Sequence, residues 1–255
     1  MTEMIIYENP LNETIRLCLR LEHLFRQIDY YMQRESTWDT RAALNAILEI
    51  LGVIERPDLK NKLGQILNQY ITAFSALAKS EDIDKKLLAT TLTQLNKAMH
   101  EVHANQSKVG QELRSNEFLN AILQRLSTPA GTCAFSIPFY HLWLHQPANI
   151  RLKNLTLWLG PLEALRNIIN LILKITRDSV QVENLIAKGG FYQASLDPNL
   201  AYQMIGIEIP VKEKLYPEIS VGRYRLTIHF FELSTKKRAC QTAEDVSFRL
   251  SYCRV

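Results

Sequence analysis

The chain has 255 residues, of which 47% are hydrophobic and 22% are charged, with nine glycines and nine prolines. This composition supports a packed core in one large domain or two small ones, argues against disorder, and suits long helices better than an all-β fold with many turns. The formal net charge of +4 is below what a dedicated nucleic-acid-binding domain usually carries, and it permits an acidic protein partner.

The N-terminal residues have neither the basic nor the apolar region of a secretory signal. The longest apolar stretch, residues 162–175, is interrupted by Glu163, Arg166 and Lys174 and is too short to span a bilayer. The cysteines lie far apart, which is typical of reduced structural thiols: Cys18, Cys133, Cys240 and Cys253. We therefore expect a cytoplasmic protein without membrane insertion.

Up to about residue 180, the apolar residues recur with helical spacing. The first helix is predicted to begin near Asn12, a good N-cap after Pro10. A second helix is predicted over residues 40–51, with Asp39 as a possible cap and Gly52 at its end. A third is predicted to begin at Pro57 and Asp58 and to end at residue 77, and a fourth to run from Asp82 to residue 102. Three more helices are predicted over residues 116–126, 139–145 and about 155–177. Residues 127–138 are predicted to form a loop. Short connections between long helices imply antiparallel neighbours.

Beyond residue 180, apolar and polar residues alternate as in half-buried strands. Strands are predicted over residues 205–209, 224–230 and 246–252, and residues 4–7 could join the same sheet. The pair Gly189-Gly190 is typical of a turn or bulge. If the apolar residues face the core, Arg225, His229 and Arg249 point outward.

These patterns predict an α+β chain. A large antiparallel helical domain, residues 8–181, is expected to pack on a smaller antiparallel β domain, residues 182–255 together with a strand at residues 3–7.

No sequence motif for phosphate binding, dinucleotide binding or metalloprotease chemistry is present. His141 and His145 have the i, i+4 spacing of a helical metal-binding pair, with Cys133 nearby, and His100 and His103 form an i, i+3 pair. The i, i+4 pair has no acidic residue at the usual adjacent positions, and we expect packing and helix-end roles for both pairs. We expect no catalytic residues, no metal and no cofactor. An enzyme using Cys133 with His141 and His145 is the minor alternative.

Basic residues are the stronger signal. Arg16 and Arg20 lie one helical turn apart on the first predicted helix. Residues 223–238 contain one acid, Glu232, together with His229 and five arginines and lysines: Arg223, Arg225, Lys236, Lys237 and Arg238. Arginine is suited to an acidic peptide because its planar fork binds a carboxylate through two hydrogen bonds.

Five segments in order along the chain resemble the ZapD family, the bacterial Z-ring-associated division proteins. They are ENPLNE at 8–13, LRLE at 19–22, RLSTPAGTCAFSIP with HLWLH at 125–145, GFYQ at 190–193, and LYPEIS with RLTIHF at 215–230. The resemblance implies a symmetric homodimer that binds the C-terminal tail of FtsZ, cross-links FtsZ protofilaments into bundles and acts at the mid-cell division ring.

The resemblance also implies a basic cavity in the contact with FtsZ. Arg20 and His141 match basic positions of that surface, and Arg56 and Arg225 fit it by local sequence. The complete set of expected partner-binding residues is Arg16, Arg20, Arg56, His141, Arg223, Arg225, His229 and Arg249. The chain departs from the family pattern at Glu117, where arginine is expected, and at His229, where another basic residue is expected, so the details of the cavity are expected to differ.

The alternative function is nucleic-acid binding through the same basic patch. Aromatic residues interleave with the arginines there: Tyr224, Phe230, Phe231 and Tyr252. The alternation places most of these rings inward, which favours a core role, and we expect no nucleic-acid partner.

Overall fold

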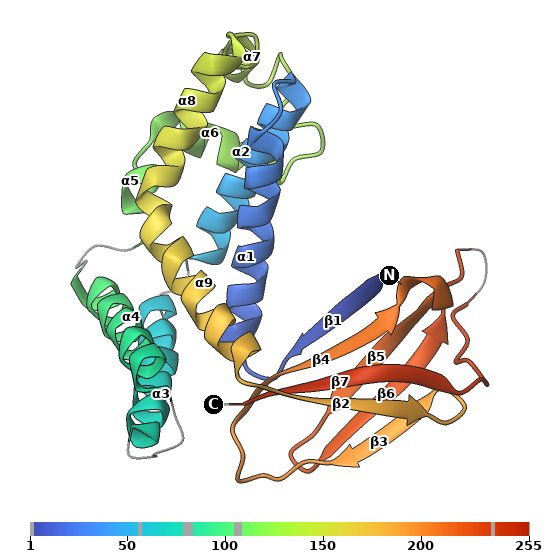
Figure 1. The fold of residues 1–255 in the computed structure, drawn as a ribbon. Coiled ribbons are helices and arrows are strands. Elements are labelled where there is room, and N and C mark those ends of the chain that lie inside the picture. The colour runs from blue at the N-terminus through green and yellow to red at the C-terminus, as the bar shows by residue number, and fades with distance from the viewer. Residues whose placement is uncertain (1–2, 56–57, 79–83, 105–108, 236–237, 255) are drawn as a thin grey trace. The chain divides into compact units, whose positions relative to one another are not determined.

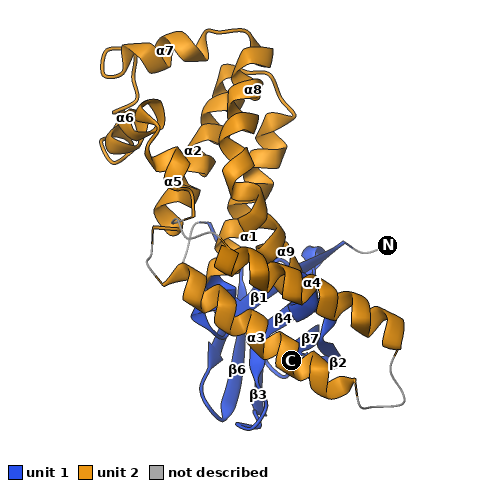
Figure 2. Cartoon of the chain, turned by 90° about the vertical axis from the view of Figure 1, so that its left-hand side faces the viewer, with its two compact units in different colours: residues 1–16, 173–255 blue, residues 17–172 orange. Residues whose placement is uncertain are grey.

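The computed structural model describes residues 3–55, 58–78, 84–104, 109–235 and 238–254 (Figure 1). The chain divides into two compact units (Figure 2). Residues 1–16 and 173–255 form the first, here called the β unit, and residues 17–172 form the second, the helical unit.

The helical part of the chain follows the predicted order closely. Its elements are α1 (Glu13–Met32), α2 (Thr37–Val53), α3 (Leu59–Leu77), α4 (Lys85–Ala104), α5 (Gln111–Arg114), α6 (Glu117–Leu126), α7 (Pro138–Leu144), α8 (Ala148–Leu159), the 3₁₀ turn η1 (Gly160–Leu162) and α9 (Glu163–Asp178). The helices α3 and α4 lie side by side as an antiparallel hairpin (Figures 1 and 2). The short helix α5 was not predicted.

The helix starts confirm one predicted cap and correct another. The Asn12 side chain accepts a hydrogen bond from the Ile15 amide at 2.8 Å, so Asn12 caps α1 as predicted. In α2 the cap is Ser36 instead of Asp39, because the Ser36 hydroxyl accepts from the Asp39 amide at 3.0 Å and the helix starts at Thr37. Gly52 lies inside α2, which continues to Val53. The predicted starts at Pro57 and Asp82 lie outside the described residues.

The long helix predicted over residues 155–177 is wrong. The chain forms α8 and α9 with η1 between them, and Pro161 stands in the first turn of η1. Proline has no amide hydrogen to continue a helical ladder, and its ring clashes with the preceding turn. The apolar stripe continues across the break, which is why periodicity alone did not detect it.

The β unit consists of two antiparallel sheets in the described part of the chain. The first sheet has the order β1 (Met4–Pro10), β4 (Tyr202–Pro210), β7 (Val246–Arg254) and β2 (Val180–Ala187). The second has the order β3 (Phe191–Ser195), β6 (Arg225–Glu232) and β5 (Leu215–Val221). As expected, the N-terminal strand joins the C-terminal strands, with Tyr7 opposite Ile207.

Strands β2, β3 and β5 were not predicted. All three lie at sheet edges, and almost all of their residues are exposed or only partly buried, so they lack the strongly apolar positions of the central strands. Pro217 within β5 also weakens its strand signal, although an edge strand tolerates proline because one row of its amides is unpaired.

Apolar side chains from both sheets meet in one core. Leu226, Ile228 and Phe230 of β6 are fully buried and belong to the same cluster as Ile207 and Leu250 of the first sheet. Because side chains alternate along a strand, Arg225 and His229 lie on the outer face of the second sheet, and Arg249 lies on the outer face of the first. The predicted outward orientation of these residues is confirmed.

Candidate functional site: a basic groove in the β unit

An open groove of about 640 Å³ lies in the β unit. Its walls come from the end of β1, the connection between β3 and β4, and the end of β5. Its apolar side chains are Leu11, Leu196, Leu200, Tyr202, Ile219 and Val221. Leu200 is 38% exposed, so part of this apolar surface is accessible to a ligand.

Two of the predicted arginines, Arg16 and Arg223, line this groove. Arg16 donates to the Glu13 carboxylate at 2.8 Å, with 46% of its side chain exposed. An exposed pair of this kind contributes about 0–1 kcal/mol, so a ligand carboxylate can compete for Arg16 at little cost. The Arg223 guanidinium lies 5.3 Å from the centre of the Tyr224 ring, and the side chain is exposed. The groove therefore presents two accessible guanidinium groups beside an apolar floor.

The acid that lines this groove is already engaged. The Asp197 carboxylate accepts hydrogen bonds from the Asn199 backbone amide at 2.9 Å and from the Asn199 side-chain amide at 3.0 Å. Asp197 thereby fixes its own turn, and both of these hydrogen bonds go to the same carboxylate oxygen, Oδ1. This turn was not predicted, although the sequence Asp-Pro-Asn at residues 197–199 is a signal for one.

The other predicted residues of the β unit lie elsewhere. Arg225 pairs across the strands with Ser195, and its side chain is exposed on the outer face of the second sheet. His229 lies on the same face, with its ring 4.9 Å from that of Phe191 and its Nδ1 3.0 Å from Gln241 Oε1. Arg249, on the first sheet, forms an ion pair with Glu208 at 2.8 Å.

Arg20 and His141 belong to the helical unit. Arg20 is exposed and lines an open hollow of about 420 Å³ with Glu49 and apolar residues of α2 and α6. The exposed His141 ring on α7 lies 4.4 Å from the ring of His145, the C-cap residue of that helix. Arg56 lies outside the described residues, and Glu117 is exposed in the first turn of α6.

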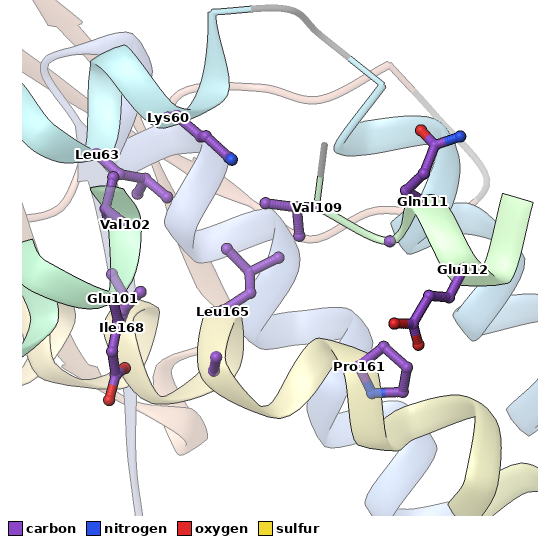
Figure 3. Close-up of a pocket in the computed structure, with 12 residues that line it drawn as sticks. Lys60, Leu63, Glu101, Val102, Val109, Gln111, Glu112, Pro161, Leu165 and Ile168 are labelled. Atoms are coloured by element: carbon purple, nitrogen blue, oxygen red, sulfur yellow. The ribbon is translucent and has the colours of Figure 1, made fainter. Parts of the chain in front are cut away.

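Another hollow in the helical unit measures about 190 Å³ (Figure 3). Leu63, Val102 and Leu165 provide much of its apolar lining, while Lys60, Glu101 and Glu112 add charged side chains to it. Its small volume and mixed charges make it a weaker candidate for an acidic partner than the groove with Arg16 and Arg223.

The Cys133 thiol does not form the pair with histidine that the minor alternative requires. Its sulfur lies 3.2 Å from the Ser136 hydroxyl, and this hydrogen bond lowers the pKa of the thiol. The His145 Nδ1 atom is instead 2.8 Å from the His141 carbonyl oxygen. Over the described ranges, no group of three or more histidine, cysteine or acidic side chains is placed to hold a metal ion.

The aromatic residues near the basic patch do not form one exposed surface. Phe230 is fully buried and Tyr252 is 9% exposed, and both belong to the core of the β unit. Tyr224 is 57% exposed. Bases stack on accessible aromatic faces, and the two rings in the core do not offer such a face.

The fold and this surface together define an α+β protein whose candidate binding site is an open basic groove. None of the helices within the described residues has the length and apolarity needed to cross a membrane.

Comparison with known proteins identifies the family. Residues 19–229 match the model of the ZapD family, described as a cell division protein. The chain is 41% identical over 253 residues to the cell division protein ZapD of Coxiella burnetii, which covers 98% of each chain. It is 35% identical to the protein of the same name from Methylococcus capsulatus over 99% of each chain, and 36% identical to that of Azoarcus sp. over 98% of this chain and 99% of the relative. The chain therefore belongs to the ZapD family of cell division proteins.

Proposed function

We propose that the protein binds the C-terminal tail of FtsZ and, as a homodimer, cross-links FtsZ protofilaments into bundles at mid-cell, which promotes Z-ring assembly. The groove in which Arg16 and Arg223 border an apolar floor carries this proposal. Such a surface suits a tail that bears both carboxylates and apolar side chains, because arginine binds carboxylates in a two-pronged geometry.

Weak individual contacts are sufficient for this function. Exposed charge pairs contribute about 0–1 kcal/mol each, so one tail in one groove is held loosely and is released by salt. A dimer has two grooves, and a filament presents many tails. Linked binding of this kind raises the overall affinity by about 10²–10⁴-fold without further contacts, and no catalysis is needed.

Replacing both groove arginines, Arg16→Ala with Arg223→Ala, is expected to weaken binding of an FtsZ tail peptide on the order of tenfold, since charge-assisted hydrogen bonds are lost. Fluorescence anisotropy with a labelled peptide measures this, and the difference should shrink as salt is raised. Lys212→Ala is the matched control, because Lys212 is a cation of the β unit that is 69% exposed and does not line the groove. Equal affinity of the double variant and the wild type would contradict the proposed site.

The same assay ranks the remaining predicted contacts. Alanine variants at these positions are compared one by one: Arg20, Arg56, His141, Arg225, His229 and Arg249. Because surface substitutions usually change stability by less than about 0.5 kcal/mol, a variant that unfolds identifies a structural residue instead of a contact.

Bundling is tested by sedimentation of FtsZ filaments with this protein. Full-length FtsZ is expected to pellet as bundles, and FtsZ without its C-terminal tail is expected to remain mostly unbundled. Equal bundling of the two forms would overturn the proposal.

A further inference from the structure

Strand β5 lies at one edge of the second sheet, where β6 pairs with it on one side only in the described part of the chain. Its last residues, Ile219 and Val221 among them, line the groove that also contains Arg16 and Arg223. An edge strand presents unpaired N–H and C=O groups, to which the backbone of another chain can pair. The groove therefore combines part of a sheet edge with apolar side chains and two guanidinium groups.

The hydrogen bonds between β5 and β6 show which backbone groups of β5 are turned to the free edge. Neighbouring residues of a strand direct their backbone groups to opposite sides, so every second residue bonds to the same neighbouring strand. The Lys214 carbonyl accepts a hydrogen bond from the Leu233 amide at 2.9 Å, just before the start of β5. Just after its end, the Gly222 amide donates to the Arg225 carbonyl at 2.8 Å. The even-numbered residues of β5 therefore bond to β6, and the odd-numbered residues turn their backbone groups to the free edge.

Among these odd-numbered residues, the two that line the groove are the ones that offer both a free amide and a free carbonyl. The Leu215 carbonyl accepts a hydrogen bond from the Tyr7 hydroxyl at 3.4 Å, and Pro217 has no amide hydrogen. In the described ranges, the amides and carbonyls of Ile219 and Val221 have no hydrogen-bond partner. The open part of the edge and the groove therefore coincide.

The other strand that borders the groove, β1, offers little to a peptide backbone. Asn9, Pro10 and Leu11 line the groove. Pro10 has no amide hydrogen, and the Leu11 amide already donates to the Gln203 carbonyl at 3.0 Å. Asn9 belongs to the same alternating set as Leu11, so its backbone groups are turned toward β4. A peptide that enters the groove as a strand is therefore expected to pair with β5.

We propose that an acidic peptide binds in this groove in an extended conformation, as an added strand on the free edge of β5. Added strands gain affinity from main-chain hydrogen bonds, and their alternate side chains give specificity. Because side chains alternate along a strand, apolar side chains of the peptide contact the leucines of the groove and the intervening carboxylates reach Arg16 and Arg223. The volume of about 640 Å³ is within the range of about 300–1,000 Å³ that is typical of ligand-binding clefts. This inference rests on the proposed function, in which the peptide is the FtsZ tail, and it assigns the conformation and the pairing of that tail.

Amide hydrogen exchange of the wild-type protein, resolved by residue with NMR, tests this pairing directly. The Ile219 and Val221 amides are expected to exchange rapidly in the free protein. With an FtsZ tail peptide at about ten times its Kd, their exchange is expected to slow about tenfold, because only the free fraction of the protein then exchanges. The Ser220 amide is the internal control, since it is turned toward β6 and should change little. Unchanged exchange at Ile219 and Val221 with the peptide bound would overturn the inference.

Val221→Pro removes one of the two free amides of the edge. Pro217 shows that β5 accommodates proline at a position turned to the free edge. The variant is expected to bind the tail peptide on the order of tenfold more weakly, because a main-chain hydrogen bond is lost and the proline ring obstructs the edge.

Gln193→Pro is the matched control for this variant. Gln193 is exposed on β3, the other edge strand of the second sheet, and does not line the groove. The Gly190 carbonyl accepts from the Phe230 amide, so the even-numbered residues of β3 bond to β6 and Gln193 is turned to its free edge. Gln193→Pro should bind the peptide with wild-type affinity. Circular dichroism verifies that both proline variants are folded, and the exchange measurement on the wild-type protein does not depend on either of them.

The outcomes separate this inference from the proposed function. A tail peptide that binds the wild-type protein without protecting the Ile219 and Val221 amides, or that binds folded Val221→Pro as tightly as the wild type, overturns strand addition alone. A tail peptide that does not bind the wild-type protein overturns the proposed function.

Discussion

Arg151→Met is expected to lower the free energy of unfolding of the helical unit by about 3 kcal/mol. Arg151 is only 5% exposed, and its guanidinium donates to the carbonyl oxygens of Glu35, Ser36 and Gln146 at 2.7, 3.3 and 3.0 Å, and to the Thr40 hydroxyl at 2.5 Å. These bonds tie α8 to the start of α2. Methionine has a similar volume but no donors, so several acceptors would lose their partner.

Urea unfolding followed by tryptophan fluorescence measures this effect selectively, because Trp38, Trp143 and Trp158 all belong to the helical unit. Arg151→Lys should recover only a small part of the loss, since one ammonium group cannot reproduce the planar fork of donors. Lys153→Met, an exposed position on the same helix, is the control and should change the stability by less than about 0.5 kcal/mol. A wild-type midpoint for Arg151→Met would show that the buried hydrogen bonds contribute little net stability.

Gly190→Ala is expected to destabilise the β unit by about 2–4 kcal/mol. Gly189 and Gly190 have φ values of +55° and +69°, as a tight hairpin turn of two residues requires, which confirms the turn predicted from the sequence. A Cβ at Gly190 would lie 2.6 Å from the Thr242 carbonyl oxygen and 2.7 Å from the Thr242 Cγ2 atom. The Gly190 carbonyl also accepts a hydrogen bond from the Phe230 amide at 2.8 Å, so a shift of Gly190 would disturb this bond as well.

Gly189→Ala is the matched control for this effect. It has the same kind of positive φ, but the nearest atom to its added Cβ is the Ala243 carbonyl oxygen at 3.8 Å. Gly189→Ala should therefore show only the cost of the left-handed conformation, about 1–2 kcal/mol. Differential scanning calorimetry, together with hydrogen exchange in β3 and β6, measures the difference. Equal losses for the two variants would mean that the strands shift to relieve the clash at Gly190.

The sequence by itself determined those elements of local structure that depend only on residues close together in the chain. Helical spacing located most of the helices, Asn12 predicted the cap of α1, and strict alternation located β4, β6 and β7, because each of these signals depends on residues a few positions apart. The break at Pro161 was not predicted because the apolar stripe continues across it. The edge strands β2, β3 and β5 were not predicted because their largely exposed residues give a weak alternating pattern.

Only the tertiary structure decided which basic residues share a surface. Arg16 and Arg223 are distant in sequence and line one groove, whereas Arg225, two residues after Arg223, lies on the outer face of the second sheet and Arg249 on that of the first. Charge type and outward orientation follow from composition and the two-residue period of a strand. The grouping of outward residues depends on which distant strands pair and in what register, and packing of the whole core fixes that pairing.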